Sequence, residues 1–371
     1  MLKNKIIILP LEGSWNHSAD FLRQTAFTLS KNNLVYIYDQ NNHYFFLKKN
    51  KKKSYPHHQN IIFHQVKYYL PFERFKLIDK INRHLSFKIF TKTLPKKKKI
   101  LWIFYPYYYD LAKIAAKSIC KIYDCVDYNE NQKQEEALID NVDYFFVNSL
   151  ALKNLHKNKS KKPIYLNAQG FFQPEDKKIV KFKLHKGEKK AIIGYVGGIN
   201  CRLDYQLLDQ LIKKHPEYLF VFHGPEQKNK DKDKIYHTKY WIKRLKSYKN
   251  STFALSENRY DLYGIIRNFD VAIIPYNPDI IFNKYCYPMK IFEFFYLNKP
   301  VVSSPILELK QQKFQDFVRI SSTYEQWEKN INYFLKHKLS QKQMKIQKQM
   351  AIENSWKQKI EKISQTISFE K

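Results

Sequence analysis

Short apolar runs alternate with amphipathic stretches along the first half of the chain. Residues 5–10 and 34–38 are apolar runs, and a helical pattern over 19–30 separates them. A strand, a helix and a strand of these lengths predict a βαβ unit of a parallel sheet. The same alternation then predicts strands at 100–105, 121–124 and 144–147 and helices at 111–118 and 133–141. We therefore expect an α/β domain in this half.

The second half repeats this alternation after an irregular stretch. Residues 158–190 are rich in Lys and contain Pro163, Pro174 and Gly187, which predicts a linker. Beyond it the pattern predicts strands at 191–196, 219–223, 271–275 and 301–303, helices at 205–214, 261–267 and 289–297, and two Lys- and Gln-rich helices over 324–367. The expected organisation is a first domain at 1–187, a second domain at 188–350 and a terminal segment at 351–371.

A basic and aromatic stretch at about 48–99 interrupts the first half and is predicted to be an insertion. It holds 16 Lys and Arg residues against two acidic ones, Glu73 and Asp79. Interleaved Lys and aromatic side chains are typical of segments that rest on an anionic membrane. The alternative is a solvated pair of Lys-rich helices with an ordinary apolar face.

Composition limits the class of protein. The chain has 371 residues, of which 44% are hydrophobic and 16% aromatic, which excludes disorder as a whole. Its net charge of +32 favours an anionic partner, although a biased genome would leave the same excess of Lys. Four scattered cysteines, with no Cys/His pair at zinc spacing, predict neither a disulfide framework nor a structural metal. With no signal peptide or spanning segment recognised, we expect a cytoplasmic protein, at most peripheral on the inner face of the plasma membrane.

A predicted strand ends in two glycines, Gly197 and Gly198, and continues through Arg202 and Asp204 into a predicted helix. Glycines at such a turn allow a phosphate or sugar to approach the backbone, and Arg202 is placed to pair with a phosphate. The alternative is an ordinary tight turn between strand and helix.

A second stretch places a cation and a carboxylate one helical turn apart. Pro288 suits a helix start, and Lys290 and Glu293 then share one face. Lys290 and the start of the helix suit a diphosphate, and Glu293 suits ribose hydroxyls. A simple ion pair is the alternative, which the surrounding aromatic residues disfavour.

Taken in order, these motifs resemble the donor half of GT-B glycosyltransferases of the group 1 type, which build teichuronic acid and other bacterial surface polysaccharides. The segments that carry the resemblance are Gly194-Tyr195-Val196-Gly197-Gly198, Phe222-His223-Gly224-Pro225, Asp270-Val271-Ala272-Ile273-Ile274-Pro275-Tyr276 and Pro288-x-Lys290-x-x-Glu293. More loosely, residues 122–127 and 143–149 resemble acceptor-side strands, and Ser355-Trp356 resembles the family's terminal helix.

The resemblance implies an α/β fold of two Rossmann-like domains that face a cleft, with a C-terminal helix crossing back to the first domain. It implies that the second domain binds a nucleotide-sugar donor through seven residues: Gly197, Gly198, Arg202, Gly224, Lys290, Glu293 and Tyr285. Many relatives carry two glutamates eight positions apart, whereas Tyr285 stands at the earlier position here.

Sugar transfer also requires a base and a means of neutralising the leaving diphosphate. The first candidate for the base is Asp127, and the second is Asp124. The alternative for each is that its carboxylate caps the helix that follows. His17 is a candidate acceptor-side residue. The one D-x-D, at 231–233, lies in a Lys-rich run, so we expect no metal and no cofactor, with Arg202 and Lys290 supplying the positive charge.

The expected function is transfer of a hexose from a nucleotide sugar to a hydroxyl of a lipid-linked glycan acceptor at an anionic membrane surface, with no nucleic-acid partner. Two alternatives remain open. One is a nucleotide-sugar 2-epimerase of the same fold, and the other is a basic nucleic-acid-binding protein.

Overall fold

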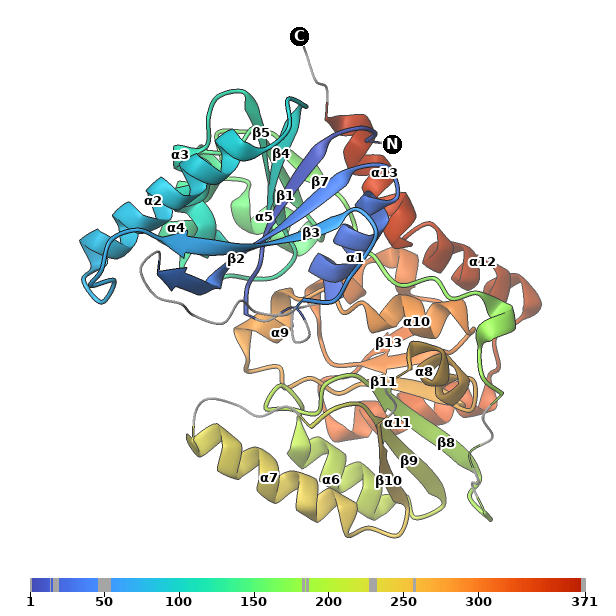
Figure 1. Cartoon of the computed structure of the whole chain (residues 1–371). Coiled ribbons are helices and arrows are strands. Elements are labelled where there is room, and N and C mark those ends of the chain that lie inside the picture. The colour runs from blue at the N-terminus through green and yellow to red at the C-terminus, as the bar shows by residue number, and fades with distance from the viewer. Residues whose placement is uncertain are drawn as a thin grey trace. The chain divides into compact units, whose positions relative to one another are not determined.

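The computed structural model of the chain describes residues 2–13, 15, 20–45, 55–181, 184, 187–226, 232–255 and 258–367. The chain forms two compact units (Figure 1). Unit 1 combines Met1–Gly170 with Trp356–Lys371, and unit 2 comprises Phe171–Ser355. Unit 2 is thus formed by one continuous segment in the middle of the chain, whereas unit 1 is formed by two segments that are far apart in sequence.

Unit 1 is built on a seven-stranded parallel sheet in the order β3-β2-β1-β4-β5-β6-β7. Its strands are β1 Ile6–Pro10, β2 Leu34–Phe45, β3 Ile61–Tyr68, β4 Lys99–Ile103, β5 Ile119–Cys125, β6 Tyr144–Val147 and β7 Ile164–Leu166. Every residue of β1 is buried, as expected of a central strand that helices cover on both faces. That burial explains why residues 6–9 form an unbroken apolar run.

The helices of unit 1 are α1 Asp20–Ser30, α2 Lys76–Thr93, α3 Tyr109–Ile114, α4 Gln132–Asp140, α5 Leu150–His156 and α13 Trp356–Thr366. Helix α1 packs against α13, while α3 contacts both α2 and α4 (Figure 1). The strand order reverses between β1 and β4, so the carboxyl ends of these strands border the point where doubly wound sheets bind ligands.

Helix α13 belongs to unit 1, which confirms the predicted return of the terminal helix. The Lys359 ammonium lies 3.2 Å from the Asp124 carboxylate, and both side chains are at most 1% exposed. The Trp356 ring covers Gly170 so closely that a Cβ there would lie 2.6 Å from it. Helix α13 is therefore fastened by a buried ion pair and by a contact that only glycine permits.

Unit 2 has a six-stranded parallel sheet in the order β10-β9-β8-β11-β12-β13. Its strands are β8 Ala191–Val196, β9 Tyr218–His223, β10 Ser251–Ala254, β11 Val271–Ile274, β12 Val301–Ser303 and β13 Val318–Ile320. The helices are α6 Tyr205–Lys214, α7 Lys232–Lys246, α8 Arg259–Ile266, α9 Ile281–Tyr285, α10 Lys290–Tyr296, α11 Tyr324–Lys336 and α12 Gln341–Ile352. The order reverses between β8 and β11, so these strands border the corresponding ligand position in unit 2.

Local sequence explains several helix ends of unit 2. The Asp204 carboxylate accepts a hydrogen bond from the Leu207 amide at the start of α6, and Thr323 accepts one from Gln326 at the start of α11. Asn298, just after α10, adopts a φ of 58°, the left-handed conformation in which helices commonly end.

The stretch predicted as an insertion at about 48–99 is not an insertion in its described part, residues 55–99. Residues 61–68 form β3, which pairs with β2 as an edge strand of the unit 1 sheet, and 76–93 form α2. The prediction of an insertion is therefore wrong. The strand was missed because β3 is an edge strand and half solvated, so it lacks the continuous apolar run of a central strand.

The unit boundary also differs from the predicted one. The chain divides after Gly170, because the Phe171 ring already packs on Phe292 and Tyr296 of α10. The predicted linker contains β7, and the end of the chain forms three helices, α11 to α13, where two were predicted. Within the described ranges, no helix combines the length and the apolar composition that crossing a bilayer requires.

Candidate functional site

Two glycines meet where β8 and β9 end. Gly197 follows β8 with a φ of 122°, and Gly224 follows β9 with a φ of 150°. A Cβ on Gly224 would overlap the carbonyl oxygen of Gly197, and one on Gly197 would lie 2.8 Å from the Lys290 ammonium. Backbone conformation therefore favours glycine at both positions, and at Gly224 the space for a side chain is also lacking.

Lys290 brings a buried positive charge to the glycine turn. Its side chain is 9% exposed, and its ammonium donates hydrogen bonds to the hydroxyls of Tyr195 (3.0 Å) and Tyr276 (2.9 Å). The Tyr195 hydroxyl in turn donates to the carbonyl of Gly198 (2.9 Å). Burial raises the pKa of Tyr195 well above its usual value, so this hydroxyl keeps its proton. Lys290 is thus fixed beside the turn through two tyrosines.

Arg202 lies beside the same tyrosine as Lys290. Its guanidinium is 4.5 Å from the ring centre of Tyr276 and equally far from that of Phe282, and the Lys290 ammonium is 4.8 Å from the Tyr276 ring. The Asn283 side chain accepts a hydrogen bond from the Arg202 Nε (2.7 Å) and donates one to the Arg202 carbonyl (3.0 Å). The two predicted cations are therefore brought together and held in place.

The remaining predicted donor residues lie on the same unit. Glu293 is 7% exposed, one turn after Lys290 in α10, and Gly198 directly follows Gly197. Tyr285 is the last residue of α9, half-buried, with the Lys284 ammonium 6.0 Å from its ring.

A pocket of about 200 Å³ lies near this site, beyond the ends of β12 and β13. Its lining includes Asp204, Ser304, Ser321, Tyr324 and Trp327, and none of the predicted donor residues. The glycine turn and its two cations are therefore the candidate anion site, and the pocket is a separate feature.

In unit 1, Asp127 is half-buried just beyond the end of β5. It lies near Tyr105, which follows β4 and whose hydroxyl is hydrogen-bonded to Glu12, the second residue after β1. Burial, and after it the nearby charges of Glu12 and Asp127, raise the pKa of Tyr105. Three polar side chains thus share the carboxyl edge of the sheet at its switch point, where α/β proteins place functional groups.

Asp124 occupies a different environment from Asp127. Its carboxylate is fully buried and paired with Lys359 of α13. A base must reach the proton that it removes, and this carboxylate has no exposed surface. The geometry therefore gives Asp124 a structural role and leaves Asp127 as the candidate base.

Other predicted residues lie outside the described ranges. His17 is one of these, and so is Asp231, the first residue of the D-x-D; α7 begins at the next position. Conversely, sequence reasoning gave no site role to Glu12, Tyr105, Tyr276 and Asn283, although Tyr276 ends one of the segments that carry the resemblance. The signal available for these four is position, since each follows a strand end or a short loop beside the switch point.

No family model matches the chain. Its two doubly wound units nevertheless define a protein of the GT-B fold, as the sequence predicted, and solved structures of that fold match 98% of its length. These include sucrose-phosphate synthase from Thermosynechococcus elongatus, with a TM-score of 0.73, 14% identity and 98% of that chain covered. HepE from Anabaena, in complex with UDP, has a TM-score of 0.70, 13% identity and 100% of that chain covered.

A sequence relative confirms the resemblance to glycosyltransferases of surface glycans. TuaH of Bacillus subtilis strain 168, named for an inferred role as a teichuronic acid biosynthesis glycosyltransferase, is 24% identical over 119 residues. The match spans 32% of this chain and 28% of TuaH, so the chain covers well under two thirds of that relative.

Proposed function

We propose that this protein transfers a sugar from a nucleoside diphosphate sugar to a hydroxyl of a lipid-linked glycan. The observation that carries the proposal is the anion site of unit 2, where Lys290 and Arg202 flank a turn whose two glycines exclude side chains. Support also comes from the fold, since HepE, which shares it, has been solved with UDP-glucose.

In the proposed reaction the acceptor oxygen forms a bond to the anomeric carbon, while the bond from that carbon to the diphosphate oxygen breaks. Asp127 takes the proton of the acceptor hydroxyl. Lys290 and Arg202 stabilise the charge that develops on the diphosphate, which removes the need for a metal ion. Glu293 accepts hydrogen bonds from the ribose hydroxyls.

Nucleotide binding is the direct test. We expect one of UDP, GDP, CDP and ADP, titrated calorimetrically, to bind the wild type and to bind Lys290→Met and Glu293→Gln at least tenfold more weakly. The control is Lys284→Met, because Lys284 is an exposed lysine of α9 near the site. Equal affinities in all four proteins would refute the assigned site.

Transfer itself is tested with a sugar derivative of the nucleoside diphosphate that binds and with lipid-linked acceptors from the cells that make this protein. We expect Asp127→Asn to bind the nucleotide normally and to lose transfer at least a hundredfold, as removal of a general base does. Interconversion of the donor to its 2-epimer, without an acceptor, would instead support the epimerase.

A lipid-linked acceptor also requires contact with a membrane, and α2 offers a surface for it. Its outer face, defined here as Leu77, Ile81, Leu85 and Ile89, follows steps of four residues, so these side chains form one stripe. All four are exposed, Leu77 by 70%. Exposed lysines accompany the stripe at positions 76, 80, 88 and 92, as expected of a helix lying in an anionic headgroup layer.

Vesicle sedimentation tests this contact. We expect binding to vesicles that contain phosphatidylglycerol and not to pure phosphatidylcholine, with each Lys→Gln on α2 weakening it about fivefold. The pair Leu77→Ser and Ile81→Ser should abolish binding, whereas Ile346→Ser, at an exposed position of α12, should not. Retention of binding in the double variant would exclude α2 as the membrane contact.

Steeply salt-dependent binding to DNA without nucleotide binding would favour the nucleic-acid alternative.

A further inference from the structure

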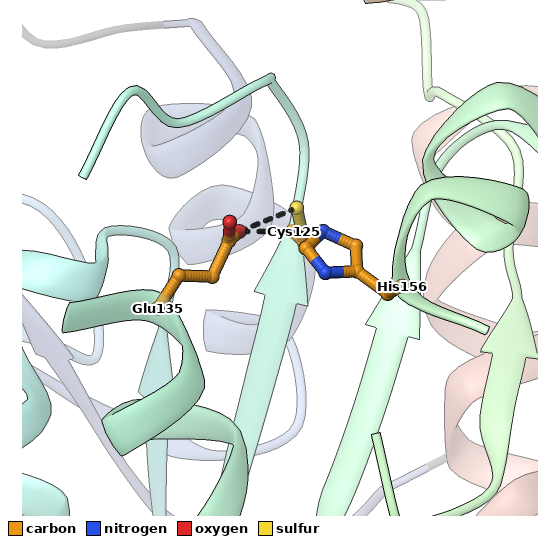
Figure 2. A group of neighbouring side chains, drawn as sticks. All are labelled: Cys125, Glu135 and His156. Carbon is orange, nitrogen blue, oxygen red and sulfur yellow. Dashed lines mark hydrogen bonds and ion pairs between the residues drawn. The ribbon is translucent and has the colours of Figure 1, made fainter. Parts of the chain in front are cut away.

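Three side chains that the proposed reaction does not use converge in the interior of unit 1 (Figure 2). Cys125 ends β5, Glu135 lies in α4, and His156 ends α5. Their ligand atoms lie within 4.8 Å of one another, and none of the three residues is more than 1% exposed. We call this group the Cys125 cluster.

The His156 ring lacks hydrogen-bond partners within the described part of the chain. Neither ring nitrogen makes a hydrogen bond, and the Nε2 lies 3.6 Å from Glu135 Oε1, beyond hydrogen-bonding distance. Buried polar atoms nearly always have a partner, so an imidazole in this state needs an explanation. A metal ion that accepts the lone pair of Nε2 would supply one for that nitrogen, while the Nδ1 N–H would still lack a partner within the described residues.

Two distances within the cluster match the edges of a tetrahedral metal site. Bonds of about 2.3 Å to sulfur and about 2.0 Å to oxygen or nitrogen place sulfur and oxygen ~3.5 Å apart, and oxygen and nitrogen ~3.3 Å apart. Cys125 Sγ lies 3.5 Å from Glu135 Oε1, and Glu135 Oε1 lies 3.6 Å from His156 Nε2. These two edges thus fit to within a few tenths of an ångström, and all three ligand atoms lie within 4.8 Å of one another.

The surroundings hold the carboxylate in an orientation suited to a ligand. The Tyr123 hydroxyl donates to Glu135 Oε1 (2.5 Å), and the Gln132 amide donates to Oε2 (3.2 Å). Such outer hydrogen bonds are usual around metal-binding carboxylates. A thiolate and a carboxylate would also cancel the charge of a divalent ion, which matters where no water reaches the group.

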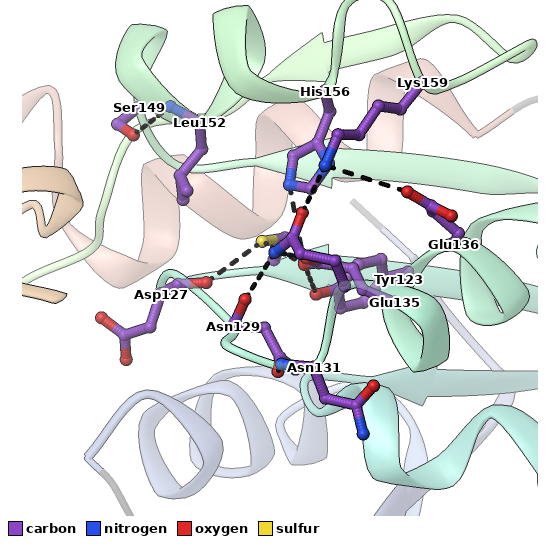
Figure 3. A network of polar contacts seen from close by, with 12 residues as sticks. Tyr123, Asp127, Asn129, Asn131, Glu135, Glu136, Ser149, Leu152, His156 and Lys159 are labelled. Carbon is purple, nitrogen blue, oxygen red and sulfur yellow. Dashed lines mark hydrogen bonds and ion pairs between the residues drawn. The ribbon is translucent and has the colours of Figure 1, made fainter. Parts of the chain in front are cut away.

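We propose that Cys125, Glu135 and His156 bind a zinc ion that ties β5, α4 and α5 together. The backbone carbonyl of Asp127, 3.4 Å from Cys125 Sγ, is placed to be the fourth ligand. Figure 3 shows the side chain of Asp127 pointing away from the cluster, so the ion would hold the backbone of the candidate base without engaging its carboxylate. The role is structural. Sequence spacing gave no sign of it, because the ligands come from three different elements.

The test uses the full chain and does not depend on activity. We expect the purified protein to contain about one zinc per chain by elemental analysis, as a closed site would. Stripped protein titrated with Co²⁺ should develop the thiolate-to-cobalt charge-transfer absorption. Cys125→Ser should abolish that absorption, and His156→Gln should weaken Co²⁺ binding at least tenfold. Cys120→Ser, on the same strand but half-buried and outside the cluster, should match the wild type.

Glu135→Gln guards against a trivial loss of folding, because it preserves the shape of the side chain while removing its charge. We expect it to keep the far-ultraviolet circular dichroism of the wild type and to bind Co²⁺ at least tenfold more weakly. Nucleotide binding by unit 2 in the same samples reports separately on the proposed function. A wild type with neither zinc nor cobalt absorption, or an unchanged absorption in Cys125→Ser, would show the cluster to be a plain hydrogen-bonded network.

Discussion

The ion pair between Asp124 and Lys359 allows the sharpest test of how unit 1 is held together. Both side chains are buried, and the Lys359 ammonium contacts the Asp124 carboxylate (3.2 Å) and the Asn167 carbonyl (3.3 Å). Replacing one partner leaves the other charge buried without compensation, which costs about 3–5 kcal/mol. We expect Asp124→Asn and Lys359→Met each to lower the free energy of unfolding by that amount.

The double variant carries the distinguishing result. With both charges removed, neither desolvation penalty remains, so the combined loss should stay below about 2 kcal/mol. The coupling energy of the double-mutant cycle should therefore exceed ~3 kcal/mol, more than a hundredfold in the unfolding equilibrium. Urea unfolding measures the free energies, and hydrogen exchange over 356–366 shows whether α13 detaches.

Two results would refute this reasoning. Additive losses would mean that the pair does not interact across its 3.2 Å separation. A double variant that folds stably but loses sugar transfer would return Asp124 to the role of base. A stable double variant that retains transfer leaves that role to Asp127.

Three further predictions concern single positions. Gly224→Ala forces a Cβ onto the Gly197 carbonyl. We expect nucleotide affinity, measured by calorimetry, to fall at least tenfold, and the free energy of unfolding in urea to fall by about 1–3 kcal/mol. Unchanged affinity would contradict the close approach of the two turns. Gly170→Ala overpacks the Trp356 ring and should destabilise unit 1 by about 1–3 kcal/mol, a loss that Trp356→Leu in the same chain should partly restore. Burial lowers the pKa of His64 from 6.5 to about 4, so the unfolded chain takes up a proton first as the pH falls. This group should therefore lower stability by up to about 3 kcal/mol between pH 6.5 and 4, and His64→Phe should make that part of the pH profile shallower by the same amount.

Much of the architecture follows from local pattern. The strands 144–147, 191–196 and 301–303 and the helix 205–214 were predicted with the bounds that the structure has, because buried runs and an amphipathic period specify them directly. The edge strand β3 escaped prediction for the opposite reason, since its residues alternate irregularly between buried and half-exposed positions.

The candidate site was predictable only where its residues lie close together in sequence. Gly197, Arg202, Lys290 and Glu293 belong to two short motifs. Tyr195 and Tyr276 also lie in quoted segments, but their contacts with Lys290 span 95 and 14 positions of the chain, so their role in holding Lys290 was not predictable. The partner of Asp124 lies 235 positions away, and no local pattern connects the two. Such pairings depend on the tertiary fold, which a single sequence does not display.

The chain threading of unit 1 has a consequence for how the protein is made. Helix α13 emerges from the ribosome only after all of unit 2 has been synthesised, yet it belongs to the unit that is made first. Until then the Asp124 carboxylate lacks its counter-charge, the surface of Gly170 lacks the Trp356 ring, and the Leu2 amide lacks the Ser364 hydroxyl that accepts its hydrogen bond. Unit 2 can fold completely during translation, whereas unit 1 stays incomplete, with the surface that α13 covers exposed, until synthesis ends. We therefore expect chaperone dependence to be concentrated in unit 1.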